Sequence, residues 1–83
     1  MYEIFYDKRI YKDIKNIPSH IVKNILKRIE ELAQTPKRKG VKKLIGIDGY
    51  RIQVGEYRIL FQIDHKEKII KVFKIKHRKD VYR

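Results

Sequence analysis

The sequence has 83 residues, and its 22 Lys and Arg against 10 Asp and Glu give a formal charge of +12 at neutral pH. This excess favours polyanionic partners, so we expect a nucleic acid; cysteine is absent and the three histidines are scattered, so we expect no metal and no cofactor. No apolar stretch approaches the roughly 18 residues that cross a bilayer, which predicts a cytoplasmic protein without membrane contact.

The first half of the chain is predicted to form a strand followed by two helices. Residues 2–6 (YEIFY) have strand propensity, and residues 8–16 place apolar side chains at helical spacing. Pro18 ends this first helix, and Ser19 can cap a second one that ends near Thr35. The apolar positions of the second helix are Val22, Ile25, Leu26, Ile29, Leu32 and Ala33. Their spacing of three and four residues predicts a face that packs on a core.

Positive charge is concentrated in the second half of the chain. Residues 1–36 hold seven basic and five acidic side chains, whereas residues 37–83 hold fifteen basic and five acidic ones. The segment 37–43 (KRKGVKK) has five cations in seven residues around a glycine, which predicts an exposed loop that is either solvated or in contact with nucleic acid.

From residue 50 onward the hydrophobic period changes to two, which indicates strands. Residues 50–54 and 57–63 alternate around a tight turn at Gly55 and Glu56, and residues 69–76 form a third strand in which Phe73 and Ile75 share a face. Three aromatic residues have the core-facing parity and are expected to pack under the helices instead of stacking on bases: Tyr50, Tyr57 and Phe61.

These elements predict an α+β fold in which residues 1–83 form one domain. Its N-terminal strand and helical hairpin are followed by a three-stranded antiparallel meander, with the helices packed on one sheet face. The other face is expected to be open.

The open face is predicted to be cationic. A two-residue turn sets Gln53 opposite Arg58, so both project from the same face as Arg51, and residues of matching parity on the third strand can join them. The expected members of this cationic face are Arg51, Gln53, Arg58, Lys74, Lys76 and Arg78. Arginine forks bind phosphate bidentately, although a one-sided sheet exposes alternate polar residues in any case. Periodicity alone leaves both interpretations open.

Residues 50–64 (YRIQVGEYRILFQID) followed by residues 71–82 (KVFKIKHRKDVY) resemble the signature half of RelE-type toxins, and the upstream helical hairpin is in the order of the RelE/ParE toxin superfamily. The resemblance implies a toxin of a type II toxin-antitoxin system. Its expected activity is ribosome-dependent, metal-independent endonucleolytic cleavage of mRNA, in which the 2′-hydroxyl of the substrate is the nucleophile. Its expected partners are a RelB-like antitoxin, mRNA on the ribosome and 16S rRNA.

The resemblance also assigns catalytic roles. Arg58 and Arg78 match the phosphate-contacting arginines of the family, and Tyr82 matches its C-terminal catalytic tyrosine. Arginine stabilises the growing charge on phosphorus but cannot act as a base, whereas nearby cations favour the phenolate of Tyr82.

The remaining positions are expected to bind RNA: Arg51, Gln53, Lys74, Lys76 and His77. The chain departs from the best-known family pattern at Gln53, where a lysine is usual, so one proton acceptor is missing. His77 lies beside Arg78, where related toxins sometimes have a functional histidine, yet its strand parity points it toward the helices. Two alternatives remain, a ParE-like toxin that poisons DNA gyrase and a non-catalytic nucleic-acid-binding domain.

Overall fold

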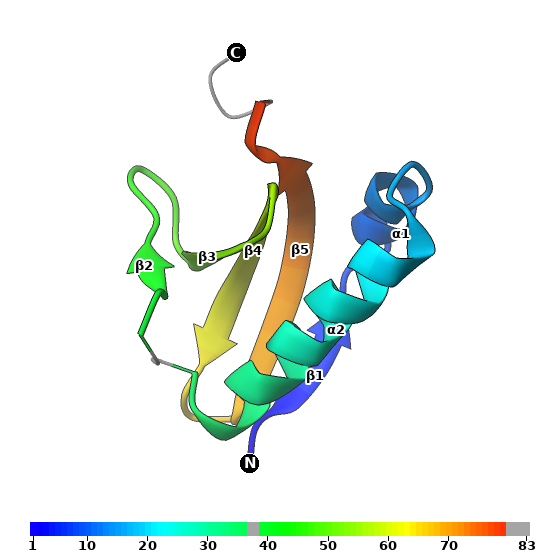
Figure 1. Cartoon of the computed structure of the whole chain (residues 1–83). Helices are drawn as coiled ribbons and strands as arrows, with labels where there is room; N and C mark the ends of the chain where they lie inside the picture. The colour runs from blue at the N-terminus through cyan, green and yellow to red at the C-terminus, as the bar shows by residue number, and fades with distance from the viewer. Residues whose placement is uncertain (37–38, 80–83) are drawn as a thin grey trace.

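The computed structural model describes residues 1–36 and 39–79, and within them two helices lie on the same side of a five-stranded sheet (Figure 1). In chain order the elements are β1 (Glu3–Tyr6), α1 (Arg9–Ile14), α2 (Ser19–Gln34), β2 (Lys42–Lys43), β3 (Tyr50–Val54), β4 (Tyr57–Asp64) and β5 (Ile69–His77). The predicted α+β fold, with the helices on one sheet face, is confirmed. No helix in the described ranges is long and apolar enough to cross a membrane.

The strand order is β1-β5-β4-β3-β2, and the predicted antiparallel meander is formed by β3, β4 and β5. The strand β1 extends this sheet by pairing in parallel with β5. The other outer strand, β2, was expected to belong to a loop. Lys42 and Lys43 are exposed as predicted, but they pair with Arg51 and Tyr50. A two-residue edge strand is too short to show a period, so alternation could not reveal it.

The helices differ from expectation at their ends. The first helix, expected over residues 8–16, begins at Arg9 and ends at Ile14. At α2 the predicted Ser19 cap is wrong, because no side chain caps this helix. Pro18 occupies the N-cap position instead, and its carbonyl accepts hydrogen bonds from the amides of Ile21 and Val22. A proline fits there because the amide it lacks would not be needed by the helix.

The core lies between α2 and the sheet. Its buried side chains come from both layers and include Ile25, Ile29, Leu32, Ile52, Ile59, Phe61, Ile70, Val72 and Ile75. Tyr50 and Tyr57 are half-buried against this cluster, which confirms their predicted core-facing parity. Full burial of one such aliphatic or aromatic side chain contributes about 1.5–3 kcal/mol, so this apolar face holds α2 in place.

A β-bulge interrupts the alternation of β5. Leu60 pairs with Lys74 while the next residue, Phe61, pairs with Val72, so Phe73 is an extra residue without a partner in the register. The expectation that Phe73 shares the core face with Ile75 is therefore wrong, because it assumed uninterrupted pairing. Val72 is buried and Phe73 only half-buried.

Candidate functional site

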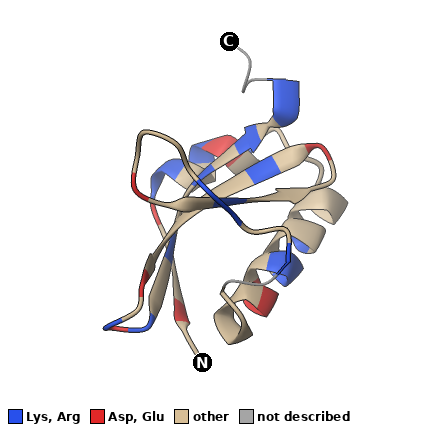
Figure 2. Ribbon diagram, turned by 90° about the vertical axis from the view of Figure 1, so that its left-hand side faces the viewer, with Lys and Arg blue, Asp and Glu red and all other residues tan. Residues whose placement is uncertain are grey.

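Strand pairing brings most of the predicted site residues together on the sheet face that the helices leave open. Gln53 of β3, Arg58 of β4 and Lys76 of β5 form one cross-strand row, and Arg51 and Lys74 lie in the next row, on either side of Leu60. Lys42 of β2 extends that second row. Figure 2 shows Lys and Arg on these neighbouring strands. The pairing register therefore forms the predicted cationic face, because residues that pair across neighbouring strands have their side chains on the same side of the sheet.

Gln53 holds the side chain of Arg58. The Arg58 Nε atom donates to Gln53 Oε1 at 3.2 Å, and Gln53 Nε2 donates to the carbonyl of Gly55 at 2.7 Å. The hairpin turn therefore fixes the amide, and the amide fixes the guanidinium. Only Nε is used in this contact, so the two terminal nitrogens of Arg58 remain as a fork for a phosphate group.

Arg78 follows β5 and contacts the β3–β4 turn. Its amide donates to the carbonyl of Glu56 at 2.7 Å, which extends the β4–β5 pairing past Tyr57 and His77. Its Nε lies 3.9 Å from Glu56 Oε2, and both side chains are more than half exposed. An exposed pair at this distance contributes at most about 1 kcal/mol. The backbone of Arg78 is therefore fixed while its guanidinium can leave Glu56 for a phosphate.

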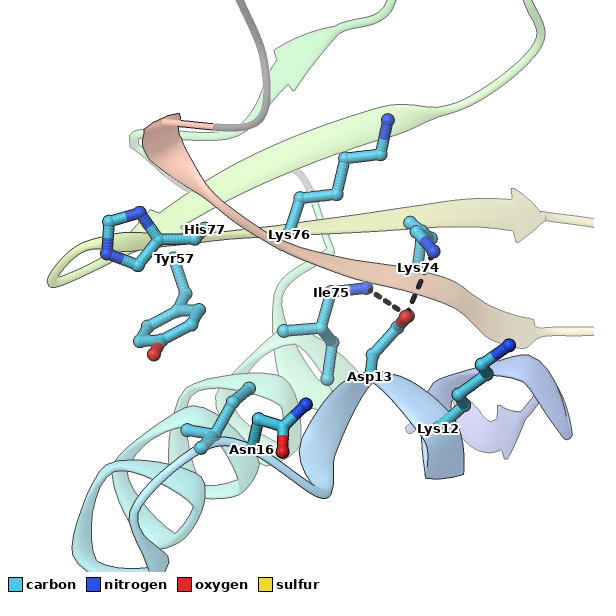
Figure 3. Close-up of a pocket in the computed structure, with 9 residues that line it drawn as sticks. Lys12, Asp13, Asn16, Tyr57, Lys74, Ile75, Lys76 and His77 are labelled. Atoms are coloured by element: carbon cyan, nitrogen blue, oxygen red, sulfur yellow. Dashed lines mark hydrogen bonds and ion pairs between the residues drawn. The ribbon is translucent and has the colours of Figure 1, made fainter. Parts of the chain in front are cut away.

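Lys74 makes an ion pair that the sequence did not reveal. Its Nζ lies 2.9 Å from Asp13 Oδ1, and Asp13 Oδ2 accepts the amide of Ile75 at 3.1 Å (Figure 3). The pairing of β1 with β5 stops at Val72, so Asp13 of α1 takes an amide beyond the end of that strand. Because Asp13 neutralises it, Lys74 contributes less to the potential of the cationic face than Arg51 or Lys76.

His77 lies on the opposite side of β5 from Arg58, as its parity predicted. It pairs with Tyr57, and the two rings meet edge to face with centroids 5.1 Å apart. The amide of Lys79 donates to His77 Nδ1 at 3.1 Å, which leaves Nε2 to carry the proton of the neutral ring. His77 therefore does not join Arg58 on the cationic face.

Tyr82 lies outside the described residues, so its catalytic role stays a prediction. Within the described ranges, no group of three or more His, Cys, Asp or Glu is placed to hold a metal ion. Among the residues that the structure describes, the side chains with shifted pKa values are not members of the cationic face. Arg9 donates to Asp7 and holds the pKa of that carboxyl well below its usual range, and burial raises the pKa of Tyr6.

Comparison with known proteins gives matches over nearly the whole chain. Residues 4–82 match the family described as "ParE toxin of type II toxin-antitoxin system, parDE", a range that contains every predicted site residue. Toxin RelE3 of Methanocaldococcus jannaschii is 33% identical over 85 residues, which cover 96% of this chain and 94% of that protein.

Solved structures give the same result. The chain is 34% identical to one in the RelB-RelE antitoxin-toxin complex from Methanococcus jannaschii, with a TM-score of 0.76 over 94% of each chain. It is 30% identical to a chain of the archaeal RelE-RelB complex from Pyrococcus horikoshii OT3, with a TM-score of 0.81 over 93% of this chain and 94% of that one.

Proposed function

We propose that this chain, which belongs to the RelE/ParE superfamily of type II toxins, arrests translation by cutting messenger RNA on the ribosome. The observation that carries the proposal is the Arg58 guanidinium, held through Nε by Gln53 and surrounded by Arg51 and Lys76 on one open sheet face. A fixed fork among further cations suits a phosphate that gains negative charge during reaction. A substrate on the ribosome would require the protein to act in the cytoplasm.

The reaction needs no group beyond the RNA and protein side chains. The 2′-oxygen of the substrate attacks the adjacent phosphorus, the bond to the 5′-oxygen breaks, and the products are a cyclic phosphate and a 5′-hydroxyl. One proton leaves the 2′-hydroxyl and one reaches the 5′-oxygen. Arg58 stabilises the charge on the non-bridging oxygens, and Arg78 joins it when its guanidinium leaves Glu56.

The proton acceptor in this proposal is Tyr82. Arginine stays protonated with a pKa above about 12, and the amide of Gln53 is not a base at neutral pH. His77 projects from the opposite side of β5. A tyrosine has a reference pKa near 10, and cations close to it would favour the ionised form, which would make the phenolate a usable base.

We propose a RelB-like antitoxin as the partner that keeps the toxin inactive. The two archaeal relatives with solved structures were crystallised in complexes with RelB. A formal charge of +12 attracts an acidic chain, and carboxylates placed against Arg51 and Arg58 would occupy the same forks as the RNA phosphate.

The proposal is tested with purified protein, ribosomes and a defined mRNA. We expect cuts only in mRNA bound to ribosomes, because an open sheet face offers no enclosed groove that orients free RNA. Equal cutting of free mRNA would contradict the ribosome dependence. The name of the matched family favours inhibition of DNA gyrase as the second candidate, and a supercoiling assay on the same preparation separates the two. Inhibited supercoiling with intact ribosome-bound mRNA would establish the second candidate instead.

A further inference from the structure

A hollow of about 520 Å³ lies at the edge of β5, between the end of that strand and α1 (Figure 3). We call it the edge pocket. The lining residues that matter here are Lys12, Asp13, Asn16, Tyr57, Lys76 and His77. It is distinct from the cationic face, although Lys74 and Lys76 border both.

The edge pocket exists because β5 continues past the end of β1. β1 pairs with residues 69–72 only, whereas β5 continues to His77. The hydrogen bond from the Arg78 amide to Glu56 fixes which peptide groups face β4, so those of Ile75 and His77 point to the other side. Asp13 takes the Ile75 amide. The His77 peptide group faces the same edge, where the described residues supply no further strand.

One wall of the edge pocket is aromatic. Tyr57 and His77 are both half-buried, and their edge-to-face arrangement at 82° leaves ring surface that the other ring does not cover. The exposed side chain of Asn16 projects into the pocket from the segment after α1 (Figure 3). Its amide offers a donor and an acceptor side by side, the pattern that pairs with the edge of a nucleobase.

The charge of the edge pocket favours an anion. Lys12, Lys74 and Lys76 line it against one carboxylate, that of Asp13, so three positive charges and one negative leave two positive charges. Asp13 is already paired with Lys74, which leaves Lys12 and Lys76 for a ligand. An acidic peptide would use these charges alone, whereas the ring surface and the Asn16 amide match a ligand that carries a phosphate and a base.

We propose that the edge pocket binds one nucleotide of the RNA next to the cleaved phosphate. The base packs against Tyr57 and His77, and the Asn16 amide hydrogen-bonds the base edge. Lys76 binds the phosphate of this nucleotide. Because Lys76 pairs with Arg58, that phosphate lies beside the cationic face. The inference rests on the proposed function for the identity of the RNA as substrate. It also gives His77 a place in RNA binding, on the helix-facing side of β5 that its parity predicted.

The binding test does not depend on cleavage. The full chain is titrated with AMP, GMP, CMP and UMP while NMR follows the Asn16 side-chain amide and the His77 ring. We expect saturable shifts that are larger for one base than for the others and about tenfold weaker binding of that nucleotide to Asn16→Ala. Asn24→Ala removes the same group from the exposed face of α2 and should bind like the parent.

Three outcomes of the binding test would overturn the proposal. Equal shifts with inorganic phosphate would reduce the edge pocket to an anion site, and nucleotide shifts confined to Arg51 and Arg58 would leave it empty. A response to an acidic antitoxin peptide, without any response to nucleotides, would make it a protein-binding site.

Cleavage supplies an independent readout. In the ribosome assay, Asn16→Ala should lose about tenfold in kcat/KM at preferred sites and little at poor sites, so the pattern of cuts becomes flatter. Nucleotide binding by a parent protein that cuts no mRNA would contradict the proposed function and leave the pocket as a nucleotide site. Cleavage by the parent with an unchanged Asn16→Ala pattern and no nucleotide shifts would overturn the pocket alone.

Discussion

Gln53 Oε1 accepts a hydrogen bond from Arg58 Nε at 3.2 Å, across the pairing of β3 with β4. Since Gln53 also donates to the carbonyl of Gly55, the turn, the amide and the guanidinium form one chain of hydrogen bonds. The residue that departs from the family pattern is thus a support for a predicted catalytic arginine. Its neutral amide orients the arginine without neutralising the charge that a phosphate needs.

We predict that Gln53→Ala lowers the rate of mRNA cleavage about fivefold, because loss of one exposed hydrogen bond corresponds to about 1 kcal/mol. Gln53→Glu should lower it more, since a carboxylate would pair with Arg58 and repel the phosphate. Single-turnover cleavage on programmed ribosomes measures both. Gln62→Ala and Gln62→Glu change an exposed glutamine farther along β4 and serve as controls. A Gln53→Glu protein as active as the parent would show that Arg58 does not meet the phosphate.

Arg58→Ala should reduce cleavage by about 10²–10³, the usual effect of losing one transition-state charge contact, and Arg78→Ala should act in the same direction. The Arg58 side chain lies on the cationic face and that of Arg78 beside Glu56 of the β3–β4 turn, outside the core, so the fold should persist in both variants. Circular dichroism and the midpoint of thermal unfolding will check this. Cleavage at the parental rate by both variants would refute the assignment of the cationic face.

Lys74→Ala is the matched comparison for Arg58→Ala, because Lys74 is in the cationic rows but paired with Asp13. We expect cleavage to fall only a few-fold. The stability should fall by about 1 kcal/mol or less, because the ammonium is more than one-third exposed and solvent screens the pair. Urea unfolding gives the stability. A loss of activity as large as that of Arg58→Ala would mean that Lys74 leaves Asp13 to contact RNA.

The region around Asp7 should make stability sensitive to acid. The side chain of Arg9 donates to Asp7, its amide donates as well, and both lower the pKa of the Asp7 carboxyl in the folded state. A lowered folded pKa contributes stability that is present above the ordinary value of about 4 and is lost as the pH falls below it. The difference in unfolding free energy between parent and Asp7→Asn should therefore shrink from pH 7 to pH 3. Asp48→Asn removes a carboxylate from the exposed loop before β3 and is the control for a general effect of charge. If the difference for Asp7→Asn does not change with pH, the lowered pKa of Asp7 does not contribute to stability.

The alternation of residues 50–63 was enough to predict the cationic face, because a two-residue turn fixes the register of β3 and β4 and hence the parity of Arg51, Gln53 and Arg58. Local pattern failed where the structure depends on contacts between distant segments. The bulge at Phe73 adds a residue on one strand only, and the contact of Asp13 with Ile75 depends on where β1 ends. No period in the sequence encodes either feature.

Tyr82→Phe tests whether the Tyr82 hydroxyl group takes part in proton transfer. The substitution keeps the ring for stacking and removes the hydroxyl, so binding to ribosomes should persist while the cleavage step slows by about 10² or more, as for loss of a general base. Rapid-quench cleavage at saturating ribosome concentration separates the two steps.

His77→Ala is the control for Tyr82→Phe, because an imidazole is the other side chain near the end of the chain whose chemistry allows proton transfer. His77 lies on the far side of β5 from Arg58, and its Nδ1 already accepts the Lys79 amide, so it is badly placed to reach a proton on the cationic face. We therefore expect His77→Ala to change the binding of RNA more than the rate of the chemical step. Parental cleavage by Tyr82→Phe together with a 10² loss of the chemical step in His77→Ala would reverse the two roles. If neither variant slows that step, the base belongs to the ribosome or the RNA, because the arginines and Gln53 cannot supply one.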